Sequence, residues 1–263
     1  PSCLYEIWTM KILAIDTSTM LGGIAVMDEL NLIAETRLNV KSTHSERLMT
    51  EIEHCLKQSS LKISHIDVFA VAIGPGSFTG LRIGLSTVKG LSYATGKPIV
   101  SVPTLDALAL NFPYSRYPVC TMLDARKKEV YAALFKWEDD NKTELPPHPP
   151  LTKGGLRGGG AFIKLIPEAS FNPEEFMRGS LLVTDYEKFI FAGEGAVIYK
   201  NKIIDAMGEK AVFASPEKTV PSPANVASLG MKKALRGEFS EPVSLVPVYI
   251  RRSEAEVKWK GSS

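Results

Sequence analysis

The architecture of this chain can be worked out from one segment, Gly74-Pro75-Gly76-Ser77-Phe78-Thr79-Gly80-Leu81-Arg82-Ile83-Gly84. It follows an apolar run at 68–73 that predicts a buried strand, and it leads into a helical pattern at 81–95. Such a glycine-rich turn is a common place for a backbone to hold phosphate. However, a Walker loop ends in Gly-Lys-Ser/Thr, and a dinucleotide fingerprint has a third glycine where Thr79 stands. The glycines are therefore expected to serve tight turning and close packing.

The length and composition indicate an ordinary globular protein. Its 263 residues suffice for one large domain or two ordinary ones, at roughly 100–200 residues each. A formal net charge of +2 argues against a chain that grips RNA or a membrane surface by itself. Cys3, Cys55 and Cys120 are odd in number and far apart, which favours a reduced, cytoplasmic compartment. Residues 1–9 are expected to be an upstream extension, because Met10 leads directly into a strand.

The elements around the glycine-rich segment follow a recognisable order. Three strands joined by polar or glycine-bearing turns precede a helix, and strands and helices then alternate. The expected strands are 11–15, 22–27, 32–38, 68–73 and 99–102, and the expected helices are 45–59, 81–95 and 105–110. The order β-β-β-α-β-α-β-α is that of the ribonuclease-H-like unit, which the sugar-kinase, Hsp70 and actin superfamily uses twice.

The second half is expected to repeat this unit in degenerate form. A strand at 119–123 ends at Asp124, as the first strand ends at Asp16, and a strand at 130–137 follows. A proline- and glycine-rich stretch predicts a loop insertion at about 140–179. The predicted fold class is α/β with two ribonuclease-H-like subdomains, the second one degenerate. The predicted limits are 10–112 and 113–222, a closing helix at 223–236 that packs back on the first subdomain, and a tail at 237–263.

Catalytic and metal-ligand patterns are not found in the sequence. The histidines His44, His54, His65 and His148 form no His-x-x-x-His pair, so no metal site is expected. There is no Gly-x-Ser-x-Gly elbow, and no histidine can be nominated as a base for Ser77. Ser77 and Thr79 are instead expected to satisfy backbone groups, with Thr79 capping the next helix.

Nucleotide contact is left open at two turns. Asp16 and Thr17 stand where the superfamily holds a phosphate or a nucleotide-bound metal, but the turn lacks the glycine that allows close approach. Long cationic side chains fill the corresponding turn at 124–129. Gly193 and Gly195 could belong to a remnant adenosine loop. The chain is expected to carry no catalytic residue and no cofactor of its own.

The predicted helix 81–95 is unusual because Arg82 and Lys89 are its only charges. One face serves a core, and the other consists of small, weakly polar side chains. A helix without a solvated face is normally buried on both sides, which indicates either a partner surface or a central place in its own domain. Gly84 and Gly90 lower helix propensity by roughly 1 kcal/mol each, which close helix-to-helix approach would offset. Met49 in the preceding helix adds a soft contact residue.

Five segments resemble the TsaB (YeaZ) family. They are Met10-Lys11-Ile12-Leu13-Ala14-Ile15-Asp16-Thr17-Ser18-Thr19, Thr43-His44-Ser45-Glu46-Arg47-Leu48, 74–84, Asp124-Ala125-Arg126-Lys127-Lys128-Glu129-Val130-Tyr131 and Pro247-Val248-Tyr249-Ile250-Arg251. The resemblance extends from Met10 to about Glu256, apart from the insertion. It implies a subunit of the machinery that forms threonylcarbamoyladenosine (t6A) in tRNA. The family's paralogue TsaD carries a catalytic metal on a His-x-x-x-His pair, whereas this chain has Leu48 four residues after His44.

The resemblance also implies partners and a contact surface. It suggests a non-catalytic subunit that binds and activates TsaD, with the ATPase TsaE joining and tRNA reached only through the complex. Without TsaD, the chain would form a homodimer, and ATP or ADP could lie at the shared interface. No membrane is expected. The first two helices would form the contact, and the expected residues are His44, Leu48, Met49, Ile83, Gly84, Thr87, Gly90, Leu91 and Ala94.

Two enzymatic alternatives remain. One is a peptidase acting on a TsaD-like protein, with Ser77 as the nucleophile to test. The other is an ATP-dependent small-molecule kinase of the same superfamily, in which Asp16 would be required. The missing triad and metal pair argue against the first, and the degenerate turns argue against the second.

Overall fold

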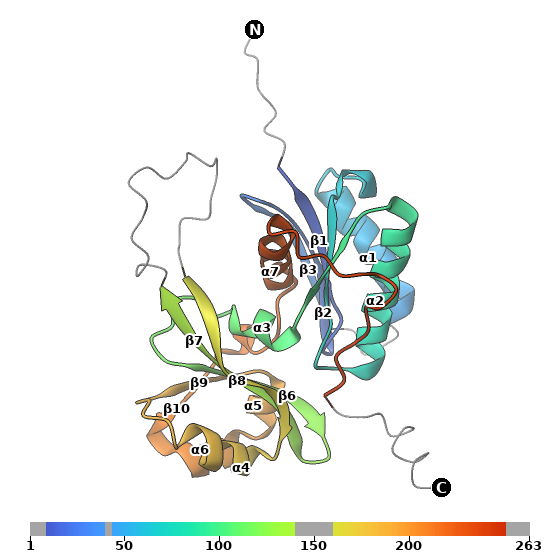
Figure 1. Ribbon diagram of the computed structural model, residues 1–263. Coiled ribbons are helices and arrows are strands. Elements are labelled where there is room, and N and C mark those ends of the chain that lie inside the picture. The colour runs from blue at the N-terminus through green and yellow to red at the C-terminus, as the bar shows by residue number, and fades with distance from the viewer. Residues whose placement is uncertain (1–8, 40–43, 140–159, 251–263) are drawn as a thin grey trace, which may run out of the picture.

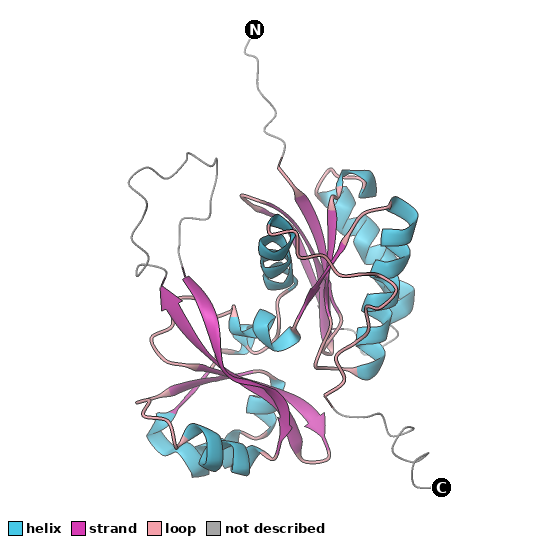
Figure 2. Ribbon diagram, viewed as in Figure 1, coloured by secondary structure: helices cyan, strands magenta, loops and turns pink. Residues whose placement is uncertain are grey.

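The computed structural model describes residues 9–39, 44–139 and 160–250. Within these ranges the chain folds into two five-stranded β-sheets with helices packed against them (Figure 1, Figure 2). The predicted α/β fold of two ribonuclease-H-like units is confirmed. Residues 1–8 and 251–263, half of the expected tail, lie outside the described part of the chain.

The first sheet has the strand order β3-β2-β1-β4-β5. Strand β1 pairs antiparallel with β2 and parallel with β4, so the three hairpin-linked strands lie on one side of the sheet. The parallel strands alternate with helices, as βαβ crossovers require. The elements are β1 (Lys11–Asp16), β2 (Leu21–Asp28), β3 (Leu32–Asn39), α1 (His44–Gln58), β4 (Val68–Ala72), α2 (Phe78–Thr95), β5 (Ile99–Val102) and α3 (Thr104–Ala109).

The second sheet repeats this order as β8-β7-β6-β9-β10. The repeat is complete in its strands, and the reduction that the sequence indicated lies in its short helices. The helical stretch 194–207 of this unit is divided into two short helices at Tyr199. The elements are β6 (Val119–Arg126), β7 (Glu129–Asp139), β8 (Gly160–Phe171), α4 (Pro173–Phe176), β9 (Phe189–Ala192), α5 (Glu194–Ile198), α6 (Lys200–Met207), β10 (Ala211–Phe213) and α7 (Pro223–Leu235).

The prediction of a loop throughout 140–179 is wrong in its second half. Residues 160–171 form β8, which pairs antiparallel with β7, and α4 begins at Pro173. Pro167 obscured this strand in the sequence, but β8 is an edge strand, and the pairing shifts register beside the proline. An edge position and a bulge are the places where a strand tolerates proline. Residues 140–159 lie outside the described chain.

Helix α3 joins the two units. Helices α1 and α2 cover one face of the first sheet, and α7 covers the other (Figure 1). Leu105 and Leu108 of α3 are buried with Leu123 and Phe135 of the second sheet, so α3 shares an apolar cluster with the second unit. Beside it, Lys164 of β8 forms an ion pair with Asp106 of α3 at 2.9 Å.

Helix α7 is tied to the first sheet through a carboxylate at its N-terminus. Glu35 of β3 accepts hydrogen bonds from Ser222 Oγ at 2.6 Å and from the Ala224 N–H at 3.1 Å. Partial burial alone would raise the pKa of Glu35, but hydrogen bonds from Arg37, Ser222 and Ala224 outweigh it and lower this pKa. Glu35 therefore acts as a helix cap supplied from a distant strand.

Replacing Glu35 by alanine is expected to lower the free energy of unfolding by about 1–2 kcal/mol at neutral pH, because α7 loses its cap. A lowered folded-state pKa means that the ionised group stabilises the fold above its unfolded pKa, and that this contribution disappears as the pH falls. Urea unfolding at pH 7 and pH 4 measures both effects. Glu209→Ala, at an exposed glutamate, is the control. An equal loss of unfolding free energy at pH 7 and pH 4 would contradict a role for the negative charge of Glu35.

Candidate functional site

The turn after β1 is closed around a buried carboxyl group. Asp16 Oδ1 accepts hydrogen bonds from the N–H of Ser18 at 2.8 Å and from its hydroxyl at 2.6 Å. Asp16 Oδ2 is buried and has no hydrogen-bond partner among the described residues. Burial raises the pKa of Asp16, and the bonds from Ser18 and the charge of Arg37 offset this only in part. The carboxyl is thus shielded from solvent.

The glycines of the glycine-rich segment bring α2 onto this turn. A Cβ on Gly76 would collide with the Ser18 carbonyl oxygen, and one on Gly80 with the Thr17 carbonyl oxygen. The Thr17 hydroxyl donates to the Gly80 carbonyl at 2.7 Å, and the Ser77 N–H donates to the Ser18 carbonyl at 2.7 Å. The expected role of these glycines in close packing is confirmed. Helix α2 therefore lies directly against the turn that holds Asp16 and Thr17, and nucleotide contact by these two residues stays a prediction.

The corresponding site in the second unit is also closed. A Cβ on Gly193 would collide with the Met122 carbonyl oxygen, and one on Gly195 would lie 3.0 Å from the Met122 carbonyl carbon. Gly193 additionally has φ +107°, which favours glycine. Burial raises the pKa of Glu194 between them, and the nearby Asp124 carboxylate adds to this. Both glycines therefore pack α5 against β6, and their part in an adenosine loop stays a prediction.

Ser77 has a structural task. Helix α2 begins at Phe78, and its N-cap is Ser77, whose Oγ accepts the Gly80 N–H at 3.2 Å. The prediction that Thr79 caps the helix is wrong, because the helix starts three residues earlier than the apolar pattern indicated. No group of three or more His, Cys, Asp or Glu side chains that could hold a metal occurs among the described residues. In the same ranges, no helix is both long and apolar enough to cross a membrane.

The expected partner face divides into surface and core positions. Met49 is about half exposed, Gly90 and Ala94 are exposed, and Ile83, Thr87 and Leu91 are partly exposed. Leu48 packs in the core of the first unit, and Gly84 is buried beside the Thr17 hydroxyl. Both stay untested as contact residues. His44 begins α1, and its side chain lies outside the described part.

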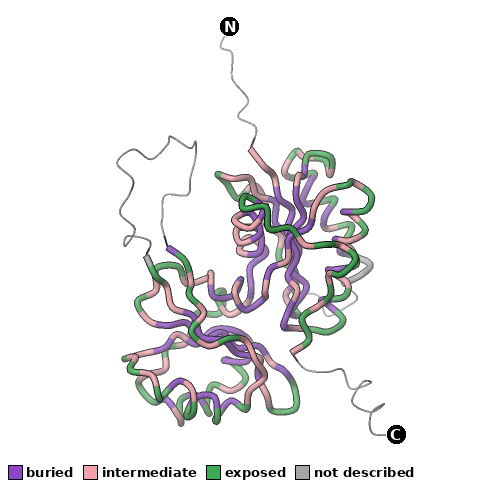
Figure 3. The backbone as a smooth tube through the Cα atoms, in the orientation of Figure 1, coloured by how far each residue is buried: buried purple, intermediate pink, exposed green. Residues whose placement is uncertain are grey.

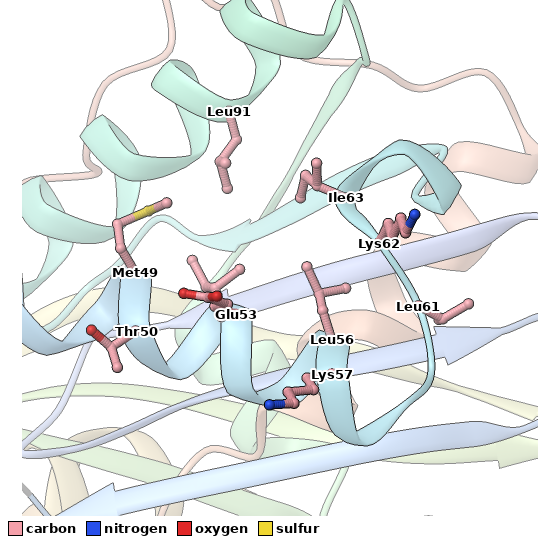
Figure 4. Close-up of a pocket in the computed structure, with 10 residues that line it drawn as sticks. Met49, Thr50, Glu53, Leu56, Lys57, Leu61, Lys62, Ile63 and Leu91 are labelled. Atoms are coloured by element: carbon pink, nitrogen blue, oxygen red, sulfur yellow. The ribbon is translucent and has the colours of Figure 1, made fainter.

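A groove of about 600 Å³ lies beside this face (Figure 4). Its walls come from α1, from the short helical turn Ile63–His65 and from Leu91 of α2. The lining is mostly apolar, with charged side chains among it. The lining residues are Met49, Thr50, Ile52, Glu53, Leu56, Lys57, Leu61, Lys62, Ile63 and Leu91. Met49 and Leu91 were predicted as contact residues from the sequence, whereas Leu61 and Ile63 were not. The apolar side chains of Leu61 and Ile63 directly after α1 could have indicated them.

The chain after α7 returns to the start of α2, another contact that the sequence did not reveal. The Val248 N–H donates to the Ile73 carbonyl at 2.8 Å, and the Tyr249 ring stacks on Phe78 at 4.8 Å. The Arg82 guanidinium lies 3.9 Å from the Phe78 ring centre and donates from Nε to Tyr249 Oη at 2.9 Å. The part of the expected tail up to Tyr249 is therefore packed on the first unit.

Comparisons with known proteins agree with this geometry. The family model described as "TsaD: tRNA N6-adenosine threonylcarbamoyltransferase" matches residues 32–259. The chain is 30% identical to "tRNA threonylcarbamoyladenosine biosynthesis protein TsaB" of Bacillus subtilis (strain 168), over 95% of this chain and 98% of that protein. The chain belongs to the TsaB (YeaZ) family. The TsaD-type model fits a fold that TsaB shares with its paralogue.

Two further relatives support the TsaB assignment. TsaB of Escherichia coli (strain K12) is 33% identical over 134 residues, which cover 50% of this chain and 57% of that protein. A Pseudomonas aeruginosa structure described as similar to peptidase YEAZ superposes with a TM-score of 0.70 at 25% identity, over 92% of this chain and all of the other.

Proposed function

We propose that this chain is a non-catalytic subunit that binds and activates TsaD, the enzyme that transfers threonylcarbamoyl to N6 of adenosine 37 in tRNA. Membership of the TsaB family supports a place in t6A biosynthesis. The observation that supports the non-catalytic role is the close packing of α2 on the β1 turn, because this turn is where the superfamily holds a phosphate. A chain without that site contributes through its surface.

The proposed contact is the exposed side of α1 and α2 with its groove. The TsaD-type family model matches this chain, so the partner is expected to present a similar helix pair. Met49, Leu61 and Ile63 supply apolar contact area, and the open Gly90 lets a partner helix approach α2 closely. The same surface would serve the homodimer when TsaD is absent. Binding of TsaE, of ATP or ADP at the shared interface, and a cytoplasmic location stay predictions.

Gly90→Glu is expected to weaken the complex with TsaD by at least about tenfold, because a buried unpaired charge would face the partner. A Cβ at Gly90 meets nothing within 4 Å, so the substitution fits the free chain. Light scattering after size exclusion measures the complex, and calorimetry measures its affinity. Gly179→Glu places the same side chain into equally open space in the second unit and is the matched control.

A wild-type chain that forms no complex with its cognate TsaD would contradict the proposed function. Equal TsaD affinity for Gly90→Glu and Gly179→Glu would instead move the contact away from α2. The peptidase alternative gains no support from Ser77, whose Oγ is engaged as a helix cap. The kinase alternative gains none from Asp16, because the turn beside it is filled.

A further inference from the structure

The turn between β6 and β7 carries three cationic residues in an unfavourable backbone conformation. Arg126, Lys127 and Lys128 have φ values of 61°, 52° and 64°. Arg126 pairs with Glu129, which leaves Lys127 and Lys128 as a two-residue loop with positive φ at both positions. A type I′ hairpin turn requires this arrangement, and it strongly prefers Asn-Gly because other residues are strained there. Such strain is found where side chains serve a function.

The flanking acidic residues are engaged within the sheet and hold this turn in place. Asp124 Oδ1 accepts the Arg126 N–H at 3.0 Å, and Asp124 Oδ2 lies 3.3 Å from Arg126 Nη1. Glu129 Oε2 accepts the Ser170 hydroxyl at 2.6 Å. The tip itself is exposed at all three cationic positions (Figure 3). The result is an anchored β-ribbon whose exposed tip carries three cationic residues, of which Arg126 is also ion-paired with Asp124.

We propose that this turn docks the phosphate backbone of RNA, an inference that rests on the proposed function because the RNA would be the tRNA of the complex. Lysine and arginine side chains supply the contacts that position proteins on nucleic-acid backbones. The turn also has no glycine to let a backbone cradle a nucleotide's phosphates closely. With a chain net charge of +2, the attraction is local to the turn and supplements the affinity of TsaD.

The test replaces Lys127→Asn together with Lys128→Gly, which gives the turn its preferred residues while removing two charges. The variant is expected to keep or raise the melting temperature, which separates loss of function from loss of folding. Complexes of wild type and variant with cognate TsaD are titrated with an unmodified tRNA transcript over a range of salt. Affinity is expected to fall about tenfold at low salt, and the salt dependence by about one unit per lysine. Lys200→Asn with Lys218→Asn removes two exposed lysines elsewhere and is the control.

Complex formation with TsaD is recorded on the same samples. A change in tRNA affinity can therefore be distinguished from a failure of the proposed TsaD binding. A weaker tRNA affinity for the turn variant alone, with TsaD binding intact, supports the inference. Unchanged tRNA affinity in an intact complex overturns it, as does an equal loss in the control. Loss of TsaD binding alone would show that the turn contacts the protein partner. Loss of ATP binding alone would show that it contacts a nucleotide. Either result overturns the RNA inference.

Discussion

Gly80→Ala is expected to lower the free energy of unfolding by about 3 kcal/mol or more, because the new methyl group would collide with a backbone atom. The Cβ would meet the Thr17 carbonyl oxygen, which cannot rotate away as a side chain would. The collision is relieved only if α2 moves away from the turn. This movement also strains the hydrogen bond from the Thr17 hydroxyl to the Gly80 carbonyl. Because Val88 and Leu85 of the same helix are in the core, this movement disturbs the whole first unit.

Gly90→Ala provides the matched control on the same helix. Its Cβ would meet nothing within 4 Å, so alanine is expected to stabilise the chain by about 0.5–1 kcal/mol through helix propensity. Urea unfolding of both variants, followed by circular dichroism, measures the contrast. A Gly80 variant as stable as wild type would mean that α2 does not lie on the β1 turn. The close packing of α2 on this turn would then no longer support a non-catalytic subunit.

The pair Gly84 and Gly90 shows how far the sequence could define the partner face. Both are glycines of a helix with only two charged residues, and both were predicted to contact a partner. The distinction depends on Thr17, more than sixty positions earlier, whose hydroxyl occupies the space beside Gly84. Helical periodicity gives the angle between two residues but does not define which distant turn lies against either one. The burial of Leu48 was unpredictable for the same reason. It depends on how α1 is rotated over the sheet, which helical periodicity does not define.

The strands show the same division between local and long-range information. The first sheet could be predicted because its strands are apolar runs bounded by polar or glycine-bearing turns, and β4 is buried at every position. Strand β8 could not, because Gly160–Phe171 follows a glycine-rich stretch and contains a proline. Its pairing with β7, which makes it a strand, is a tertiary contact. The absence of lysine after Gly80 was sufficient to reject a Walker loop, so the packing role of the segment was predictable.

Asp16→Asn is expected to make the chain more stable than wild type at neutral pH, by about 1–3 kcal/mol, because asparagine avoids the cost of ionising a buried and incompletely hydrogen-bonded carboxyl group. Burial raises the pKa of Asp16. A raised pKa means that the folded state holds the proton more tightly than the unfolded state does. The stabilising contribution of the protonated carboxyl is therefore complete below the unfolded pKa, and it is lost as the pH rises through the folded pKa. Asparagine cannot ionise and does not show this loss.

The measurement is the difference in unfolding free energy between wild type and Asp16→Asn, taken at steps from pH 4 to pH 8. Taking the difference removes the contributions of Glu35 and Glu168, whose lowered pKa values change stability in the opposite direction. Asp205→Asn, at an exposed aspartate of α6, is the control. A difference for Asp16→Asn that stays constant with pH would mean that water or a cation reaches Oδ2. The β1 turn would then be open to a ligand, and ATP binding lost in Asp16→Asn would favour the kinase alternative over a purely structural turn.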